Sequence, residues 1–161
     1  MNDLIISDYR DEFHLKIFRR WHVIKSLCSN KKFSDGVPLE KASFVDFLVS
    51  NPNLLHNILV HFNRAEPSLN LEELLYQDNM EFGSAHDVKD FGKTCIFLIK
   101  MEYIKFSKNQ GEVYLSGDNR EIFLDNMLSH RWKKEIDLLQ PILGKSMNVL
   151  SSAVLEIANG N

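Results

Sequence analysis

Apolar side chains recur at helical spacing along most of this chain. In the first organised segment, from about residue 8 to residue 29, five of them are separated by four, four, three and four positions and form one helix face: Phe13, Ile17, Trp21, Ile24 and Cys28. The prolines at positions 38 and 52 suit the first residues of two further helices, which we expect over 38–50 and 52–62. The pattern therefore predicts a helical N-terminal region, residues 1–67.

The pattern changes in the second half of the chain. A short helix is expected from Leu69 to Gln77, and a capping-box form at 84–87 precedes a longer helix over about 85–101. Residues 103–106 and 112–116 then alternate between apolar and polar, with a polar turn that ends in glycine between them. Helix, turn, longer helix and β-hairpin in this order are typical of a winged helix, in which the hairpin is the wing and the helix before it would enter a DNA groove.

Helix signals return after the hairpin. Residues 118–121 can cap a helix that continues to about Leu143, and a last amphipathic segment covers 146–158. The fold class we expect is mostly α: a winged-helix core with one β-hairpin wing, flanked by N- and C-terminal helices. We place the winged-helix region at 68–130 and the C-terminal helices at 131–161, within one compact unit.

Composition narrows the class of partner. Nineteen Lys and Arg residues face 22 Asp and Glu residues, a formal net charge of −3, whereas a protein that binds duplex DNA tightly on its own usually carries a basic excess. Cys28 and Cys95 lie in apolar helical contexts and are expected to be small buried hydrophobes. No apolar run approaches the roughly 20 residues of a membrane span, so we expect a cytoplasmic protein with no membrane partner.

No pattern of residues in the sequence points to catalysis. The two Gly-Lys pairs, 92–93 and 144–145, lack the preceding glycine of a phosphate-binding loop. Most of the acidic residues are scattered singly, and Glu72 and Glu73 form an adjacent pair. His56 and His61 are five positions apart, unlike the i, i+4 pair of a helical zinc site. We therefore expect a protein that is not an enzyme, with no catalytic residue, no cofactor and no bound metal.

The winged-helix segment, residues 84–116, carries a candidate DNA surface. Its candidate phosphate contacts are three lysines at helical spacing and one at the wing tip: Lys89, Lys93, Lys100 and Lys108. The segment has five Lys against four acidic residues, and no Arg that could read guanine. A solvated helix surface accounts for the same lysines at least as well, and winged helices also serve as protein-docking modules.

The N-terminal helix offers a second candidate surface. Phe18 and Trp21 give it more aromatic area than one helix face needs, and Arg19 and Arg20 lie beside them in the sequence. Trp and Arg are the residue types that most often carry interface energy, so these four form a candidate partner interface. The alternatives are a solvated face for the arginines and burial in the core for Trp21.

The run from Val37 to Pro52 (Val-Pro-Leu-Glu-Lys-Ala-Ser-Phe-Val-Asp-Phe-Leu-Val-Ser-Asn-Pro) resembles a signature of small bacterial middle-component proteins. These belong to ABC-three-component systems, of which the Lamassu-type anti-phage and anti-plasmid modules are examples. The resemblance extends to the N-terminal helix at 13–21, to 97–104 before the hairpin and to the C-terminal helices, and so covers most of the chain.

This resemblance implies a non-catalytic accessory subunit of an SMC complex. Such a subunit would bind an SMC- or Rad50-like ATPase and hold an effector, commonly a nuclease, in antiviral defence, with DNA sensed through the complex and bound weakly by the subunit alone. The short wing with a single lysine at its tip departs from a wing that contacts DNA. The alternative function is a transcriptional regulator that binds DNA as a dimer through the winged helix.

Overall fold

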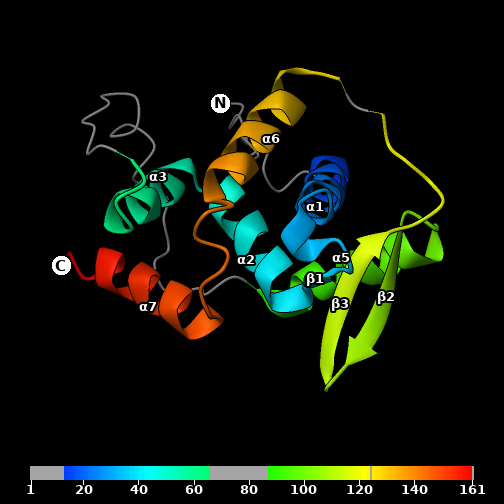
Figure 1. Cartoon of the computed structure of the whole chain (residues 1–161). Helices are drawn as coiled ribbons and strands as arrows, with labels where there is room; N and C mark the ends of the chain where they lie inside the picture. Colours follow the sequence, from blue (N-terminus) through cyan, green and yellow to red (C-terminus); the bar gives the residue numbers. More distant parts are fainter. Residues whose placement is uncertain (1–12, 66–86, 124, 161) are drawn as a thin grey trace, which may run out of the picture.

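Helices make up most of the described part of the chain, residues 13–65, 87–123 and 125–160 of the computed structural model (Figure 1). The helices are α1 (Phe13–Cys28), α2 (Leu39–Ser50), α3 (Pro52–His61), α5 (Val88–Lys100), α6 (Met127–Leu139) and α7 (Met147–Ala158), with a short 3₁₀ turn at Lys31–Phe33. The strands are β1 (Val37–Pro38), β2 (Ile104–Asn109) and β3 (Glu112–Gly117). The expected fold class, a mostly helical winged helix with one hairpin wing, is confirmed.

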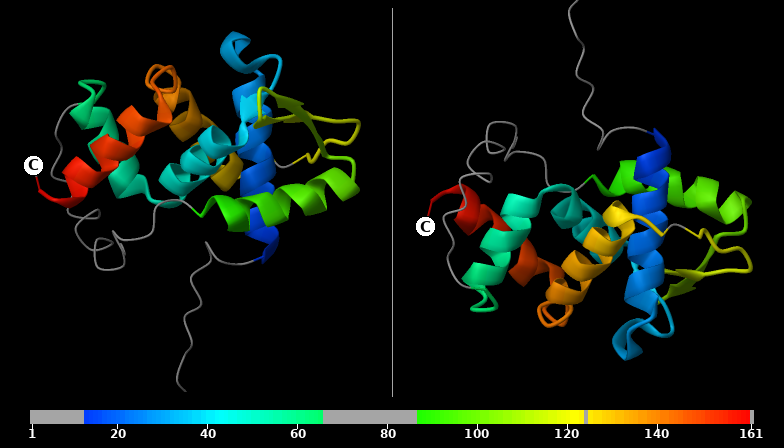
Figure 2. Two further views of the ribbon diagram at one scale, coloured as in Figure 1. Left: turned by 90° about the horizontal axis from the view of Figure 1, so that it is seen from below. Right: turned by 90° about the horizontal axis from the view of Figure 1, so that it is seen from above.

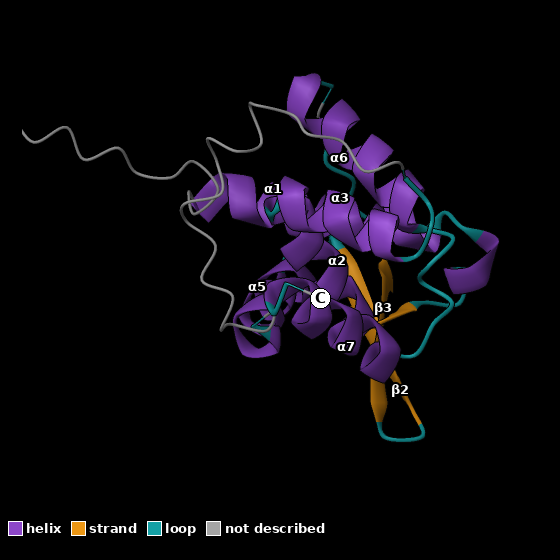
Figure 3. Cartoon of the chain, turned by 90° about the vertical axis from the view of Figure 1, so that its left-hand side faces the viewer, coloured by secondary structure: helices purple, strands orange, loops and turns teal. Residues whose placement is uncertain are grey.

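The three strands form one antiparallel sheet in the order β1-β3-β2. β2 and β3 are the predicted wing, and its tip extends away from the helices (Figure 3). The turn is tighter than the five-residue turn expected from sequence: Asn109 still pairs with Glu112, and Gln110 and Gly111 make the turn with φ values of 50° and 85°. Positive φ at both central residues is the type I′ geometry that matches the twist of a hairpin.

β1 was not predicted and joins the N-terminal region to the wing. Val37 pairs with Leu115 and Pro38 with Tyr114, so α2 begins one residue later than expected, at Leu39, with Pro38 as its N-cap. α1, α2 and α5 pack on one another, and α1 and α2 also contact β3. Elements from both sides of the predicted boundary at residue 68 therefore share one sheet and one core.

The C-terminal helices cover the rest of this core. α6 packs against α1 and α2, and α7 lies beside α3 at the end of the molecule opposite the wing (Figure 2). Fully buried aliphatic and aromatic side chains from most of the elements meet between these layers: Ile24, Leu27, Phe44, Leu48, Leu54, Ile58, Phe91, Leu98, Ile104, Leu115, Ile136 and Leu139.

The predicted start of α6 at residues 118–121 is wrong. The helix begins at Met127, where Asn126 and Ser129 form a reciprocal capping box. Residues 118–121 are not helical: the amide of Asp118 donates to the carbonyl of Tyr103 at 3.1 Å, and that of Arg120 donates to the carbonyl of Glu102 at 3.1 Å. Backbone bonds to the end of α5 thus compete successfully with helix formation there.

Residues 66–86, between α3 and α5, are not among the described residues, so the short helix expected from Leu69 to Gln77 and the capping serine at position 84 lie outside them. Asp87 is the N-cap of α5, and its carboxylate accepts from the amides of Lys89 and Asp90, both at 3.0 Å. None of the described helices is long and apolar enough to cross a membrane.

Candidate interaction surface on α5

Two adjacent arginines of α1 are buried around one carboxylate of α2. Arg19 and Arg20 are each 6% exposed and Asp46 is 4% exposed. The Nε of Arg19 donates to Oδ1 of Asp46 at 2.6 Å, and the Nε of Arg20 donates to Oδ2 at 3.1 Å. Both guanidinium charges are therefore neutralised in part by a carboxylate that is itself excluded from water, which fixes α1 against α2.

Arg20 also fixes the first half of α5. Its Nη1 donates to the carbonyl of Asp90 at 3.0 Å and to Oγ1 of Thr94 at 2.6 Å, and its Nη2 donates to Oδ2 of Asp90 at 2.6 Å. The guanidinium lies 5.3 Å from the ring centre of Phe91. The hydrogen bond from Arg20 lowers the pKa of Asp90 below its ordinary value. One side chain thus sets the position of α5 relative to α1 and α2.

These contacts remove the candidate interface on α1. Arg19, Arg20 and Trp21 are buried, and Phe18 is half-buried against the core. Both arginines are bonded inside the protein, so reversing their charges would disrupt the fold. The sequence held one signal of this network: Asp46 stands alone inside the apolar run Phe44–Leu48, where a carboxylate needs a buried partner.

The predicted lysines of α5 are exposed and lie on one face of the helix. Lys89, Lys93 and Lys100 are all exposed. At 3.6 residues per turn they fall within an arc of about 40°, opposite the buried Phe91 and Leu98. We refer to these three residues as the lysine row. Lys108 is also exposed but belongs to β2 near the turn of the wing, so the structure groups three of the four predicted lysines on α5.

Exposed apolar side chains border the lysine row on both sides. Ile96 is 56% exposed on one side, and Phe97 and Met101 are 41% and 39% exposed on the other. The ring of Phe97 makes an edge-to-face contact with Phe13 at the start of α1, which is 59% exposed, at a centroid distance of 6.2 Å. Phe13, Phe97 and Met101 form what we call the apolar strip. No local sequence pattern indicates this strip, because it crosses from α1 to α5.

Acidic residues mark both ends of α5. Asp87 caps its first turn, and Glu102, with a positive φ of 62°, follows its C-cap Met101; both acidic residues are exposed. The outer surface of α5 is therefore not uniformly basic. It combines a short lysine row with apolar side chains and carboxylates at the two ends.

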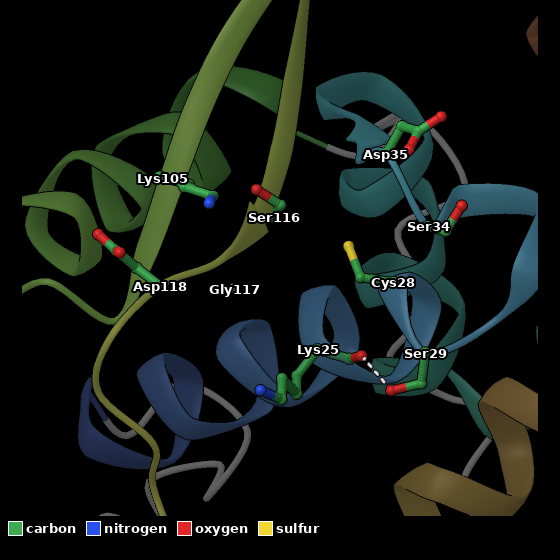
Figure 4. Close-up of a pocket in the computed structure, with 9 residues that line it drawn as sticks. All are labelled: Lys25, Cys28, Ser29, Ser34, Asp35, Lys105, Ser116, Gly117 and Asp118. Carbon is green, nitrogen blue, oxygen red and sulfur yellow. Dashed lines mark hydrogen bonds between the residues drawn. The ribbon is translucent and has the colours of Figure 1, made fainter.

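A polar hollow of about 490 Å³ lies between the end of α1, the turn at residues 34–35 and the wing (Figure 4). Its charged lining residues balance one another: Lys25 and Lys105 face Asp35 and Asp118, and Lys25 is also ion-paired with Glu121 at 2.5 Å. Within the described residues, no group of three or more His, Cys, Asp or Glu side chains could hold a metal ion.

Both thiols are held in their protonated form. Cys28 lines the hollow, with its sulfur directed toward it, and lies 3.4 Å from the carbonyl oxygen of Leu115. Burial raises the pKa of Cys28, and burial raises that of Cys95 in the core to about 12. Neither side chain has the lowered pKa of a nucleophilic cysteine.

No family model, curated protein or solved structure matches this chain.

Proposed function

We propose that this protein is a non-catalytic, cytoplasmic accessory subunit that binds an SMC- or Rad50-like ATPase and holds an effector nuclease in an antiviral defence complex. The proposal takes its partners from the resemblance of residues 37–52 to the middle components of ABC-three-component systems. The observation that carries the docking role is the outer surface of α5, where the apolar strip adjoins the lysine row.

This surface is better suited to protein than to duplex DNA. Exposed aromatic side chains that are positioned by a rigid scaffold are typical anchors of protein interfaces. Contacts to DNA phosphates need positive charge and would make no use of the apolar strip. The carboxylates of Asp87 and Glu102 at the ends of α5 would repel the DNA backbone. The net charge of −3 acts in the same direction.

The second candidate function is a transcriptional regulator that binds DNA through the same winged helix. The observation that favours it is the lysine row, because it lies on the helix that enters the groove in winged-helix regulators. Salt dependence separates the two functions. Each neutralised phosphate contributes about 0.9 to the slope of log affinity against log salt, so a regulator should bind duplex alone with a steep slope.

The test begins with the genes that flank this one, where the proposal predicts an SMC- or Rad50-like ATPase. That ATPase is then co-expressed with this chain for affinity purification, and the isolated chain is titrated separately with duplex DNA. The proposal predicts a stable complex with the ATPase and only weak, non-specific binding of the isolated chain to DNA. Nanomolar, sequence-specific binding by the isolated chain, with no ATPase retained, would establish the regulator instead.

A further inference from the structure

We propose that the apolar strip and the lysine row together bind an acidic amphipathic helix of the partner protein. This inference rests on the proposed function, because it names the kind of segment that would dock on α5. Two features of the described surface carry it: an unpartnered apolar face that spans two helices, and a line of unpaired positive charges along one side of that face.

The apolar strip has the size and position of a helix-binding site. Phe97 lies on α5, and Met101, the C-cap of this helix, follows it by one turn. Phe13 extends the strip onto α1 through its edge-to-face contact with Phe97. The side chains of all three are more than a third exposed. An amphipathic helix with apolar residues at i, i+3, i+4 and i+7 covers such a strip with one face.

Charge complementarity sets the chemistry of that helix. No described carboxylate forms an ion pair with Lys89, Lys93 or Lys100, in contrast to Lys16, whose Nζ lies 3.7 Å from Oδ2 of Asp90. Acidic residues beside the apolar stripe of the partner helix would meet these ammonium groups. Because the lysines are exposed, they would steer and orient the helix, while the apolar strip would supply most of the affinity.

A second copy of this chain and duplex DNA fit the apolar strip and the lysine row less well than an acidic helix does. A second copy of this chain, docked through the same patch by a two-fold axis, would offer each lysine row the same patch, which contains three lysines and no row of carboxylates. Duplex DNA would leave Phe13, Phe97 and Met101 facing a charged backbone or a groove for which the row has no guanine-reading arginine. An acidic helix satisfies both the apolar strip and the lysine row.

The test uses the full chain and a fluorescently labelled synthetic peptide of about 18 residues, a length that supports helix formation. The peptide carries Leu at i, i+4, i+7 and i+11 and Glu on the adjoining positions. Fluorescence anisotropy is measured at low and high salt. A peptide with Lys in place of Glu and a duplex of DNA serve as comparison ligands. Saturable binding of the acidic peptide alone, weakened by salt, is the expected result.

Variants then locate the binding surface. Phe97→Ala and Lys93→Glu should each weaken peptide binding about tenfold, as loss of a central anchor or reversal of a central charge does at interfaces. Ile96→Ala, on the other side of the lysine row, and Lys105→Glu, on the wing, are the matched controls and should leave the affinity unchanged. Circular dichroism confirms that each variant remains folded.

Every other outcome overturns the inference. No binding, or binding that Phe97→Ala and Lys93→Glu leave unchanged, excludes this surface for an acidic helix. Tighter binding of the duplex through the same residues makes DNA the ligand, and a dimer in sedimentation that Phe97→Ala dissociates makes a second copy the occupant. If the acidic peptide does not bind but the ATPase is retained in affinity purification, only the inference about the helix is refuted and the proposed function stands. If the peptide binds but the ATPase is not retained, only the proposed function is refuted.

Discussion

The guanidinium of Arg20 and the carboxylate of Asp90 meet at 2.6 Å, and this contact joins α1 to the helix that precedes the wing. Arg20 is almost fully buried, whereas the Asp90 side chain remains 41% exposed, so the bond runs from the core to the edge of the candidate surface. The position of the apolar strip and of the lysine row depends on it, because Phe97 and all three lysines are carried by α5.

Removing Arg20 should destabilise the protein strongly. The variant Arg20→Met leaves Asp46 buried with one guanidinium instead of two and frees the bonds to Asp90 and Thr94. Loss of one partner from a buried ion network typically costs about 3–5 kcal/mol, and we expect a decrease of this order in the free energy of unfolding by urea. Lys133→Ala, which breaks the exposed pair with Asp137, is the control and should cost less than about 1 kcal/mol. Equal losses of unfolding free energy for the two substitutions would show that the buried network stabilises the protein no more than an exposed ion pair does.

Asp90 should make the stability depend on pH in the acid range. Its pKa is lower in the folded protein than its ordinary value of 3.8, chiefly because of the hydrogen bond from Arg20. The stabilisation is therefore fully present above the unfolded pKa and is lost as the pH falls through the folded pKa. Urea unfolding between pH 7 and pH 3 should show a steeper loss of stability for the natural protein than for Asp90→Asn below about pH 4. Parallel curves for the two proteins would contradict this account of the contact.

The two cysteines should differ in their reaction with iodoacetamide. Cys28 lines the open hollow, whereas Cys95 is 3% exposed and has a pKa of about 12, so its thiolate fraction near neutral pH is negligible. We expect slow labelling of Cys28 and none of Cys95 in the folded protein, with both labelled rapidly in urea, as followed by peptide mass spectrometry. Labelling of Cys95 at the same rate as Cys28 under native conditions would show that α5 detaches from the core.

The raised pKa values of the two thiols should also make the stability of the protein depend on pH in the alkaline range. A thiol whose pKa is higher in the folded than in the unfolded state stabilises the fold fully below its unfolded pKa of about 9. This stabilisation is lost as the pH rises from that value through the folded pKa. The natural protein should therefore lose stability between pH 8 and pH 11, and Cys95→Ala should lose less over this interval. An equal loss in both proteins would assign the effect to other groups.

The purified chain should have no catalytic activity of its own. We expect no hydrolysis of labelled duplex DNA, single-stranded DNA or ATP in the presence of magnesium or manganese. Turnover that follows the protein through successive columns, and is abolished by substitution of one acidic residue, would contradict the accessory role. Activity that arises only after the ATPase and the effector are added is the result that the role predicts.

Hydrophobic periodicity was sufficient to predict the presence of the described helices and of the wing, though not the start of α6. The apolar spacing in α1 and the alternation in β2 and β3 are local signals, so the fold class could be inferred without long-range information. β1 could not, because a two-residue strand has no period and exists only through its pairing with Leu115 and Tyr114. The start of α6 was missed for a similar reason: the amides of residues 118 and 120 bond to the carbonyls of residues 103 and 102, and a local pattern does not show these contacts.

The candidate site was less predictable than the fold. Lys89, Lys93 and Lys100 share a face because helical spacing alone determines it. Arg19 and Arg20 were misinterpreted because their carboxylate partners, Asp46 and Asp90, are distant in the sequence and only the packing of α1 on α2 and α5 brings them together. The apolar strip likewise depends on the contact between Phe13 and Phe97, and no local sequence pattern indicates this contact.

The most direct test of the central claim places the photo-crosslinker p-benzoylphenylalanine at position 97 in the complex assembled from this chain, the ATPase, the effector and duplex DNA. A crosslinker at Leu155, which is 60% exposed on α7, serves as the matched control. We expect irradiation to join position 97 to an acidic helical segment of a protein subunit, and position 155 to no such segment. A crosslink from position 97 to DNA, or none to any protein of the complex, would contradict it.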